Sequence, residues 1–164
     1  MASTKPFEGK VIAITGGASG IGLATAHYLA ARGAALSLAD INQQNLNTAS
    51  EAIQKEHSGT KVFTAVVDVR KPPQINEWIQ STIKELGKLD GAVNLAGVIP
   101  KSIGINPVGE VDDEEWDFVL GVNLTGVFYC MRAELNAMED GGSVVNAASI
   151  AGLYPYSEGW RTSR

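Results

Sequence analysis

The stretch that decides the fold runs Thr15-Gly16-Gly17-Ala18-Ser19-Gly20-Ile21-Gly22. A short β-branched segment over residues 11–14 precedes it, and alanine- and leucine-rich residues 21–31 follow it. The first segment predicts a buried strand and the second a helix. A glycine turn between them lets the backbone approach a pyrophosphate, whose charge is favoured at the helix N-terminus. The alternative is a tight turn that binds nothing.

The alternation of short apolar segments with longer amphipathic ones continues along the chain. Asp112 and Glu115 have the spacing of a capping box before the last helix, and residues 99–109 predict a loop. Strands alternating with helices predict right-handed βαβ units, and so an α/β fold with a doubly wound parallel sheet. The predicted strands are 11–14, 35–39, 61–67, 89–95 and 143–148, and the predicted helices are 21–31, 42–57, 72–86 and 113–138.

Composition narrows the class of protein. The 164 residues are 45% hydrophobic and 19% charged, with a net charge of −5, which argues against disorder and against a broad basic surface for nucleic acid. No apolar run approaches the roughly 18 residues of a membrane span, and residues 1–10 lack the apolar core of a signal peptide. We therefore expect one soluble, cytoplasmic domain over residues 1–164, with a flexible N-terminus over residues 1–9.

Cysteine and histidine usage gives two further expectations. Cys130 is the only cysteine, so no internal disulfide forms, which suits a reducing compartment. His27 and His57 are far apart in the sequence and no cysteine cluster accompanies them. The sequence therefore predicts no metal site.

Five ordered motifs resemble those of the short-chain dehydrogenase/reductase family, from Gly9 to about Tyr156. They are the G-x-x-x-G-x-G spacing at 16–22, Asp68-Val69, Asn94-Leu95-Ala96-Gly97 (the family's N-N-A-G with leucine in second place), Asn123 and Ser149. The resemblance implies a Rossmann-like fold and hydride transfer between a nicotinamide cofactor and a secondary alcohol or ketone, with substrates that include secondary metabolites. It implies catalytic roles for Asn123 and Ser149, and cofactor contacts for Gly16, Ser19, Gly20, Ile21, Gly22, Asp68, Asn94 and Gly97.

The choice of cofactor depends on Asp40, which ends the second predicted strand. A carboxylate there can bind both ribose hydroxyls of NAD and would repel the 2′-phosphate of NADP. No lysine or arginine lies near Ser19 or Ile41 in the sequence, so NAD(H) is favoured. The alternative for Asp40 is a helix cap, and Asp68 is equally suited to cap the turn before Arg70. Arg132 faces the cofactor by resemblance, or is a solvated helix arginine.

The residues after Ser149 depart from the family. Its general acid/base is a tyrosine followed four residues later by a lysine, but Glu158 and Trp160 stand at that spacing from Tyr154 and Tyr156. We therefore expect a C-terminally truncated member with the later strands missing and a divergent tail at 157–164. The fifth strand then becomes an exposed apolar edge, and this edge or the long helix is available for association. Two functions stay open: an oxidoreductase, and an inactive nucleotide-binding remnant or interaction subunit.

Overall fold

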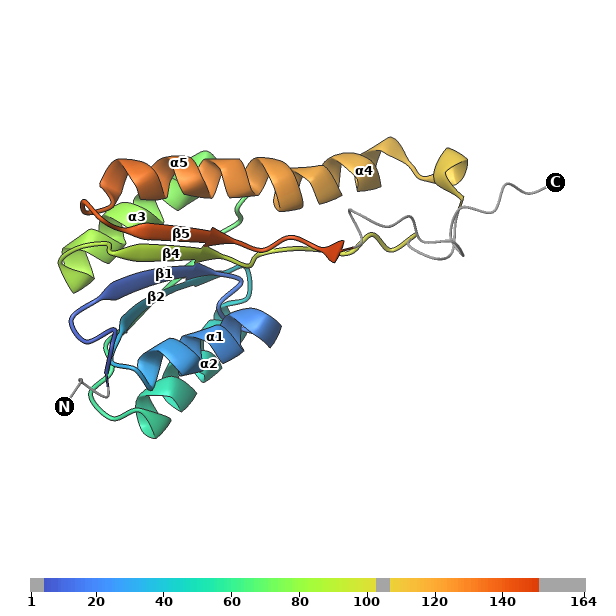
Figure 1. Cartoon of the computed structure of the whole chain (residues 1–164). Coiled ribbons are helices and arrows are strands. Elements are labelled where there is room, and N and C mark those ends of the chain that lie inside the picture. Colours follow the sequence, from blue (N-terminus) through green and yellow to red (C-terminus); the bar gives the residue numbers. More distant parts are fainter. Residues whose placement is uncertain (1–4, 103–106, 151–164) are drawn as a thin grey trace.

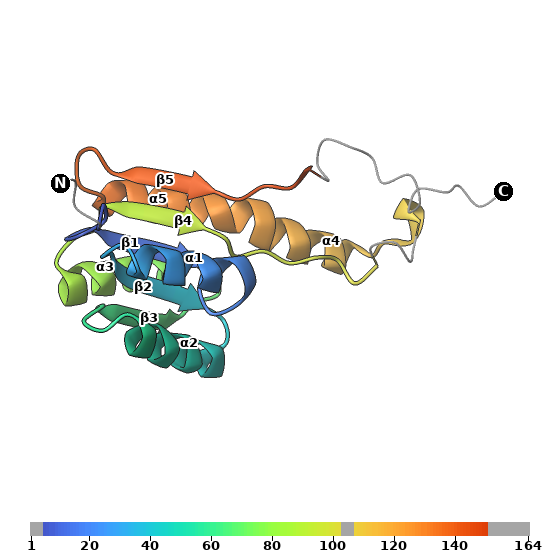
Figure 2. The same cartoon turned by 60° about the horizontal axis from the view of Figure 1, so that its bottom comes forward.

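Five parallel strands form one sheet in the order β3-β2-β1-β4-β5, as a computed structural model of residues 5–102 and 107–150 shows (Figure 2). The order reverses direction after β1, which is the signature of a doubly wound sheet. The predicted α/β class and parallel sheet are therefore confirmed. The strands are β1 (Val11–Thr15), β2 (Ala35–Asp40), β3 (Val62–Val66), β4 (Gly91–Asn94) and β5 (Ser143–Asn146).

Helices cover both faces of the sheet (Figure 1). On one face lie α1 (Gly20–Ala30) and α2 (Gln43–Glu56); on the other lie α3 (Pro72–Leu86) and α5 (Val127–Ala137). Each face has its own apolar core, because a parallel sheet is buried on both sides. Ile14, Leu36 and Leu46 belong to the core under α1 and α2, whereas Trp78, Ile75 and Leu89 belong to the core under α3 and α5.

A closed ring of hydrogen bonds ties α3 to the middle of the sheet. The indole Nε1 of Trp78 donates to Ser37 Oγ at 2.8 Å, and Ser37 Oγ lies 2.6 Å from Thr82 Oγ1. Thr82 Oγ1 donates in turn to the carbonyl oxygen of Trp78 at 2.9 Å. All three side chains are buried, so the ring satisfies polar atoms that burial would otherwise leave unpaired.

The segment predicted as one helix over residues 113–138 has three parts. α4 (Asp113–Leu120) passes into a π-helix, η2 (Gly121–Gly126), and then into α5. Glycine at the end of η2 allows close packing, because a Cβ at Gly126 would lie 2.8 Å from Val69 Cγ2. α4, η2 and α5 together form one long rod, which extends beyond the carboxyl ends of the strands (Figure 1). None of the residues of α4 is buried there.

The predicted capping box is half formed. Asp112 accepts a hydrogen bond from the backbone N–H of Glu115 at 2.6 Å, as an N-cap should. The Glu115 carboxylate does not return to Asp112 but accepts from the backbone N–H groups of Lys101 and Ser102. A short 3-10 helix, η1 (Val108–Glu110), also stands within the predicted loop. The other predicted boundaries differ from those observed by at most two residues.

Residues 5–9, predicted as part of a flexible N-terminus, form a hydrogen-bonded turn. The Phe7 N–H donates to the carbonyl of Arg32 at 3.0 Å, and the Phe7 ring packs against the core under α1. The divergent tail at 157–164 lies outside the described residues, as do Tyr154 and Tyr156. Among the helices that are described, none has the length and apolar character that a membrane crossing requires.

α1 and α2 lie alongside each other, and they bring together the two histidines, which are far apart in the sequence. The rings of His27 and His57 meet edge to face, with centroids 5.6 Å apart. Thirty residues of chain separate them, but the β1-α1-β2-α2 path returns both helices to the same edge of the sheet.

Candidate functional site

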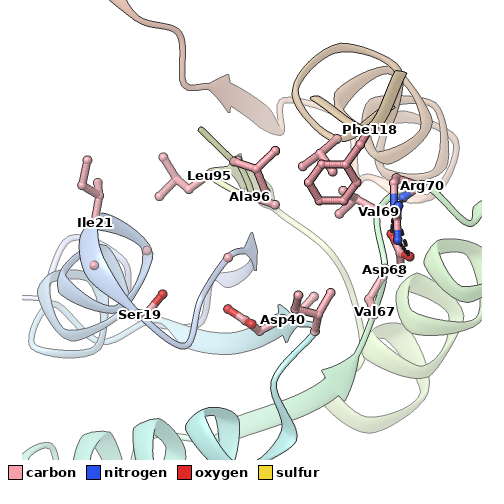
Figure 3. A pocket seen from close by; sticks show the side chains of 18 residues that line it. Ser19, Ile21, Asp40, Val67, Asp68, Val69, Arg70, Leu95, Ala96 and Phe118 are labelled. Carbon is pink, nitrogen blue, oxygen red and sulfur yellow. Dashed lines mark hydrogen bonds and ion pairs between the residues drawn. The ribbon is translucent and has the colours of Figure 1, made fainter. Parts of the chain in front are cut away.

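A cavity of about 350 Å³ opens at the carboxyl ends of β1 to β4, on the point where the strand order reverses (Figure 3). Open α/β sheets bind ligands at this position. The cavity brings together most of the residues that the sequence singled out. Those among its lining are Gly16, Ser19, Gly20, Ile21, Gly22, Asp40, Asp68 and Gly97.

The glycine turn forms one wall of the cavity and leaves no space for a side chain at Gly16 or Gly22. A Cβ at Gly22 would lie 2.0 Å from the carbonyl oxygen of Gly16, so α1 begins directly against the turn. Gly16 has φ +66°, and its own Cβ would lie 3.0 Å from the backbone of Ala96. Gly20 has φ +49°, a conformation that residues other than glycine rarely adopt.

Thr15 joins the glycine turn to the opposite wall. Its buried Oγ1 accepts hydrogen bonds from the backbone N–H groups of Leu95 and Ala96, both at 3.1 Å. These residues follow β4 and line the cavity. The sequence placed Thr15 before the turn without assigning it this role, since its partners lie 80 and 81 residues away.

Asp40 faces the cavity at the end of β2 (Figure 3). Its Oδ2 accepts from the N–H of Ala18 at 3.3 Å and its Oδ1 from the N–H of Asn42 at 3.1 Å. Asn42, not Asp40, caps α2, because its side chain accepts from the N–H of Asn45. A carboxylate has about four acceptor positions, so the two backbone bonds leave room for ligand hydroxyls.

Asp68 is held by Arg70 across the cavity from Asp40. The guanidinium donates from Nε and Nη2 to the two carboxylate oxygens, at 2.9 and 2.6 Å, and the Arg70 N–H donates to Oδ1 at 3.0 Å. The Arg70 hydrogen bonds hold the pKa of the Asp68 carboxyl below its usual value. Asp68 therefore both lines the cavity and caps the turn before Arg70. Arg70 also lies over the Phe118 ring at 4.9 Å, and the sequence singled out neither residue.

Asn94 is not among the residues that line the cavity, although Leu95 beside it is. Its buried Nδ2 donates to Glu134 Oε2 at 3.0 Å and to Asn146 Oδ1 at 2.9 Å, which ties β4 to α5 and to β5. Glu134 is itself fully buried, and burial raises the pKa of its carboxyl to about 7. The sequence did not single out Glu134.

Asn123 supports the cavity wall from the π-helical segment. Its Oδ1 accepts from the N–H of Val98 and its Nδ2 donates to the carbonyl of the same residue, both at 2.8 Å. Val98 lines the cavity, and a Cβ added at neighbouring Gly97 would lie 3.5 Å from Asn123 Oδ1. The side chain thus closes a two-bond ring with one backbone residue, which fixes both loop and helix.

Ser149 and Arg132 lie outside the cavity lining. Ser149 is exposed in the segment that follows β5. Arg132 is exposed on α5, with its guanidinium 5.2 Å from the Phe128 ring and 5.1 Å from the Tyr129 ring. The cavity therefore brings together the predicted turn residues with Asp40 and Asp68, whereas Ser149 and Arg132 lie outside its lining.

Comparison with known proteins identifies the class. The model of the short chain dehydrogenase family matches residues 10–160, and the chain belongs to this family. The Rossmann-like fold is shared with a crystal structure of levodione reductase (TM-score 0.87, 36% identity, 93% of this chain and 59% of the other). It is also shared with NAD⁺-bound xylitol dehydrogenase (TM-score 0.87, 32% identity, 94% and 58%).

Curated relatives include fungal proteins of greater length. The short-chain dehydrogenase/reductase aba4 of Botryotinia fuckeliana is 53% identical over 151 residues, which are 92% of this chain and 58% of the relative. The chanoclavine-I dehydrogenase ifgE of Penicillium roqueforti is 45% identical over 161 residues, with 93% and 60% covered. The chain thus spans about three-fifths of these relatives.

Substitution of Gly22 tests the close packing of the turn. Gly22→Ala forces the start of α1 away from the Gly16 carbonyl, and we expect the free energy of unfolding to fall by about 2 kcal/mol or more. Gly109→Ala is the control, since a Cβ there meets nothing within 4 Å. Urea unfolding of both variants measures the difference, and equal stability of the two would contradict the packing argument.

Burial of Glu134 makes a prediction about pH. Its folded pKa of about 7 exceeds the ordinary 4.5, so the folded state keeps a proton that the unfolded state loses between these values. The contribution of Glu134 to stability is therefore complete below pH 4.5 and declines by roughly 3 kcal/mol as pH rises to 7. Glu134→Gln removes this decline and gains stability relative to wild type above pH 7. Urea titrations at pH 5 and pH 8 measure it, with the exposed Glu85→Gln as control; a gain equal at both pH values would contradict the assignment.

Proposed function

We propose that the cavity binds NAD(H) in preference to NADP(H), and that the protein is an oxidoreductase which interconverts a secondary alcohol and a ketone. The observation that carries the proposal is Asp40, whose carboxylate lines the cavity at the end of β2. Likeness to chanoclavine-I dehydrogenases supports a substrate from secondary metabolism.

The dinucleotide fits the residues that are present. Gly20 and Gly22 carry no side chains in the first turn of α1, which suits a pyrophosphate at this helix N-terminus. Among the described residues that line the cavity, Arg70 is the only cation, and the Asp68 carboxylate already binds its guanidinium. A 2′-phosphate would therefore face Asp40 without a free positive charge beside it, whereas two ribose hydroxyls would find an acceptor.

In this proposal the bound nicotinamide supplies or accepts the hydride. Asp40 orients the ribose, and Asp68 contacts the adenine side by resemblance to the family. Asn123 holds the loop at Val98 in place, and by the same resemblance supports a water that carries a proton. Ser149 would hold the substrate oxygen. The general acid/base is not assigned, because the 164 residues contain no tyrosine with a lysine four residues later.

The missing tyrosine and lysine favour a second candidate for these 164 residues, a nucleotide-binding unit without catalysis. In this candidate, association runs through the edge of β5 or the long helix. Val145 on β5 is 57% exposed, and Phe128 and Leu135 on α5 are 55% and 57% exposed. Exposed apolar residues at a sheet edge favour pairing with another chain. We propose a cytoplasmic location for either candidate, since the single cysteine, Cys130, is buried and free.

Calorimetric titration of the 164-residue chain tests cofactor binding and its specificity. We expect NAD⁺ to bind more tightly than NADP⁺, and Asp40→Arg to shift the ratio of the two dissociation constants by about tenfold or more toward NADP⁺. Glu77→Arg is the matched control, because it makes the same charge change on an exposed position of α3. Absence of binding by a monodisperse sample defeats the cofactor proposal, and an unchanged ratio in Asp40→Arg defeats the role of Asp40.

Turnover separates the two candidates. We expect the cofactor-bound 164-residue chain to show little or no change in reduced-cofactor absorbance with a panel of ketones and secondary alcohols, since Ser149 and Asn123 supply no proton at neutral pH. Sustained turnover above a blank without protein would establish catalysis by these residues and reject the non-catalytic candidate.

A further inference from the structure

Both histidines of the chain meet one carboxylate on the surface formed by α1 and α2. His27 lies in the last turn of α1, Glu56 is the last residue of α2, and His57 follows it. His27 Nδ1 lies 2.8 Å from Glu56 Oε2, and His57 Nε2 lies 3.9 Å from the same oxygen. One ligand atom from each residue falls within 4.8 Å of the other two.

The spacing of these atoms suits a transition-metal ion. Zinc bonds to imidazole nitrogen and carboxylate oxygen of about 2.0–2.2 Å place tetrahedral ligands about 3.3 Å apart. The observed 2.8 Å and 3.9 Å lie on either side of that value, and all three ligand atoms lie within 4.8 Å of one another. The side chain of Glu56 is 63% exposed, which leaves it room to rotate toward an ion.

One atom of the cluster lacks a partner. His57 Nε2 is buried and makes no hydrogen bond with any described residue. A buried ring nitrogen without a partner costs free energy, and a metal ion would satisfy it. His27 Nδ1 and Glu56 Oε2 already lie within ion-pair distance, so two of the three ligand atoms are close together before an ion binds.

The direction of the helices adds an electrostatic reason. α1 and α2 each connect parallel strands, so both run from the carboxyl edge of the sheet to the amino edge, and both end at this cluster. Helix C-termini carry partial negative charge and stabilise cations nearby. The cluster therefore lies at the amino ends of the strands, opposite the cavity at their carboxyl ends. An ion bound in the cluster would join the two helices and would not contact the cofactor.

We propose that His27, Glu56 and His57 bind one zinc ion, with water in the remaining position, and that this ion clamps the end of α1 to the end of α2. Two imidazoles and a carboxylate are a ligand set that zinc accepts. Cys130 does not compete for the ion, because it is buried and burial raises the pKa of its thiol to about 12.

Zinc titration of the untagged 164-residue chain, in a buffer free of chelators, tests the site. We expect one Zn²⁺ per chain in competition with a chromophoric indicator, and about a tenfold or larger loss of affinity in Glu56→Gln and in His27→Gln. Since His27 and His57 are the only histidines, the same titration followed by imidazole nitrogen NMR should shift both sets of ring signals together.

Glu51→Gln is the matched control, because it removes a carboxylate from an exposed position on the same helix. It should bind zinc as wild type does, and circular dichroism should show that Glu56→Gln is folded. Equal zinc affinity in wild type and Glu56→Gln, or ring signals that do not move, overturns the proposal. A rise in the melting temperature with zinc in wild type but not in Glu56→Gln confirms the clamp. If wild type binds zinc and its melting temperature does not rise, the clamp is overturned.

Discussion

The contact between Gly22 and the carbonyl of Gly16 is the constraint on which the site depends. Because no atom can stand between them, α1 starts against the end of β1, and the turn has one path. That path brings Gly16 against the backbone at Ala96, where the Thr15 hydroxyl holds the loop after β4. The cavity is the space that this arrangement leaves open at the carboxyl edge. The absence of side chains at Gly16 and Gly22, together with the hydroxyl of Thr15, thus sets the position of the cavity.

The features that the sequence predicted depend on local chemistry. The glycine turn and the starts of the helices predicted at 42–57 and 72–86 each need certain residue types within a few positions of one another. The structure shows Asn42 as the cap of α2, and Pro72 and Pro73 in the first turn of α3. Alternation of strands and helices then leaves one plausible topology, since crossovers are right-handed. Asp40 was predictable for the same reason, because its place at the end of β2 determines what it faces.

The features that the sequence did not predict depend on contacts between distant residues. Nothing in the sequence around Glu134 indicates that it is buried, because its hydrogen-bond partner, Asn94, stands 40 residues earlier in the chain. The two histidines met only because α1 and α2 return to the same edge. Arg70 is close to Asp68 in the sequence, but its contact with Phe118 depends on α4, which places Phe118 in the wall of the cavity. The prediction of one uninterrupted helix over 113–138 missed η2. Hydrophobic spacing does not distinguish a π-turn from α-turns over so short a segment.

The length of η2 fixes how α4 is rotated relative to α5. Each residue of an α-helix turns the chain by about 100°, so loss of one residue within Gly121–Gly126 would rotate α4 by roughly that angle relative to α5. Phe118 would then leave Arg70, and Asn123 would lose both bonds to Val98, while α5 kept its place against the sheet. The length of η2 therefore sets the rotation between α4 and α5, and we expect a single-residue insertion or deletion there to remove these contacts although α4 itself is exposed.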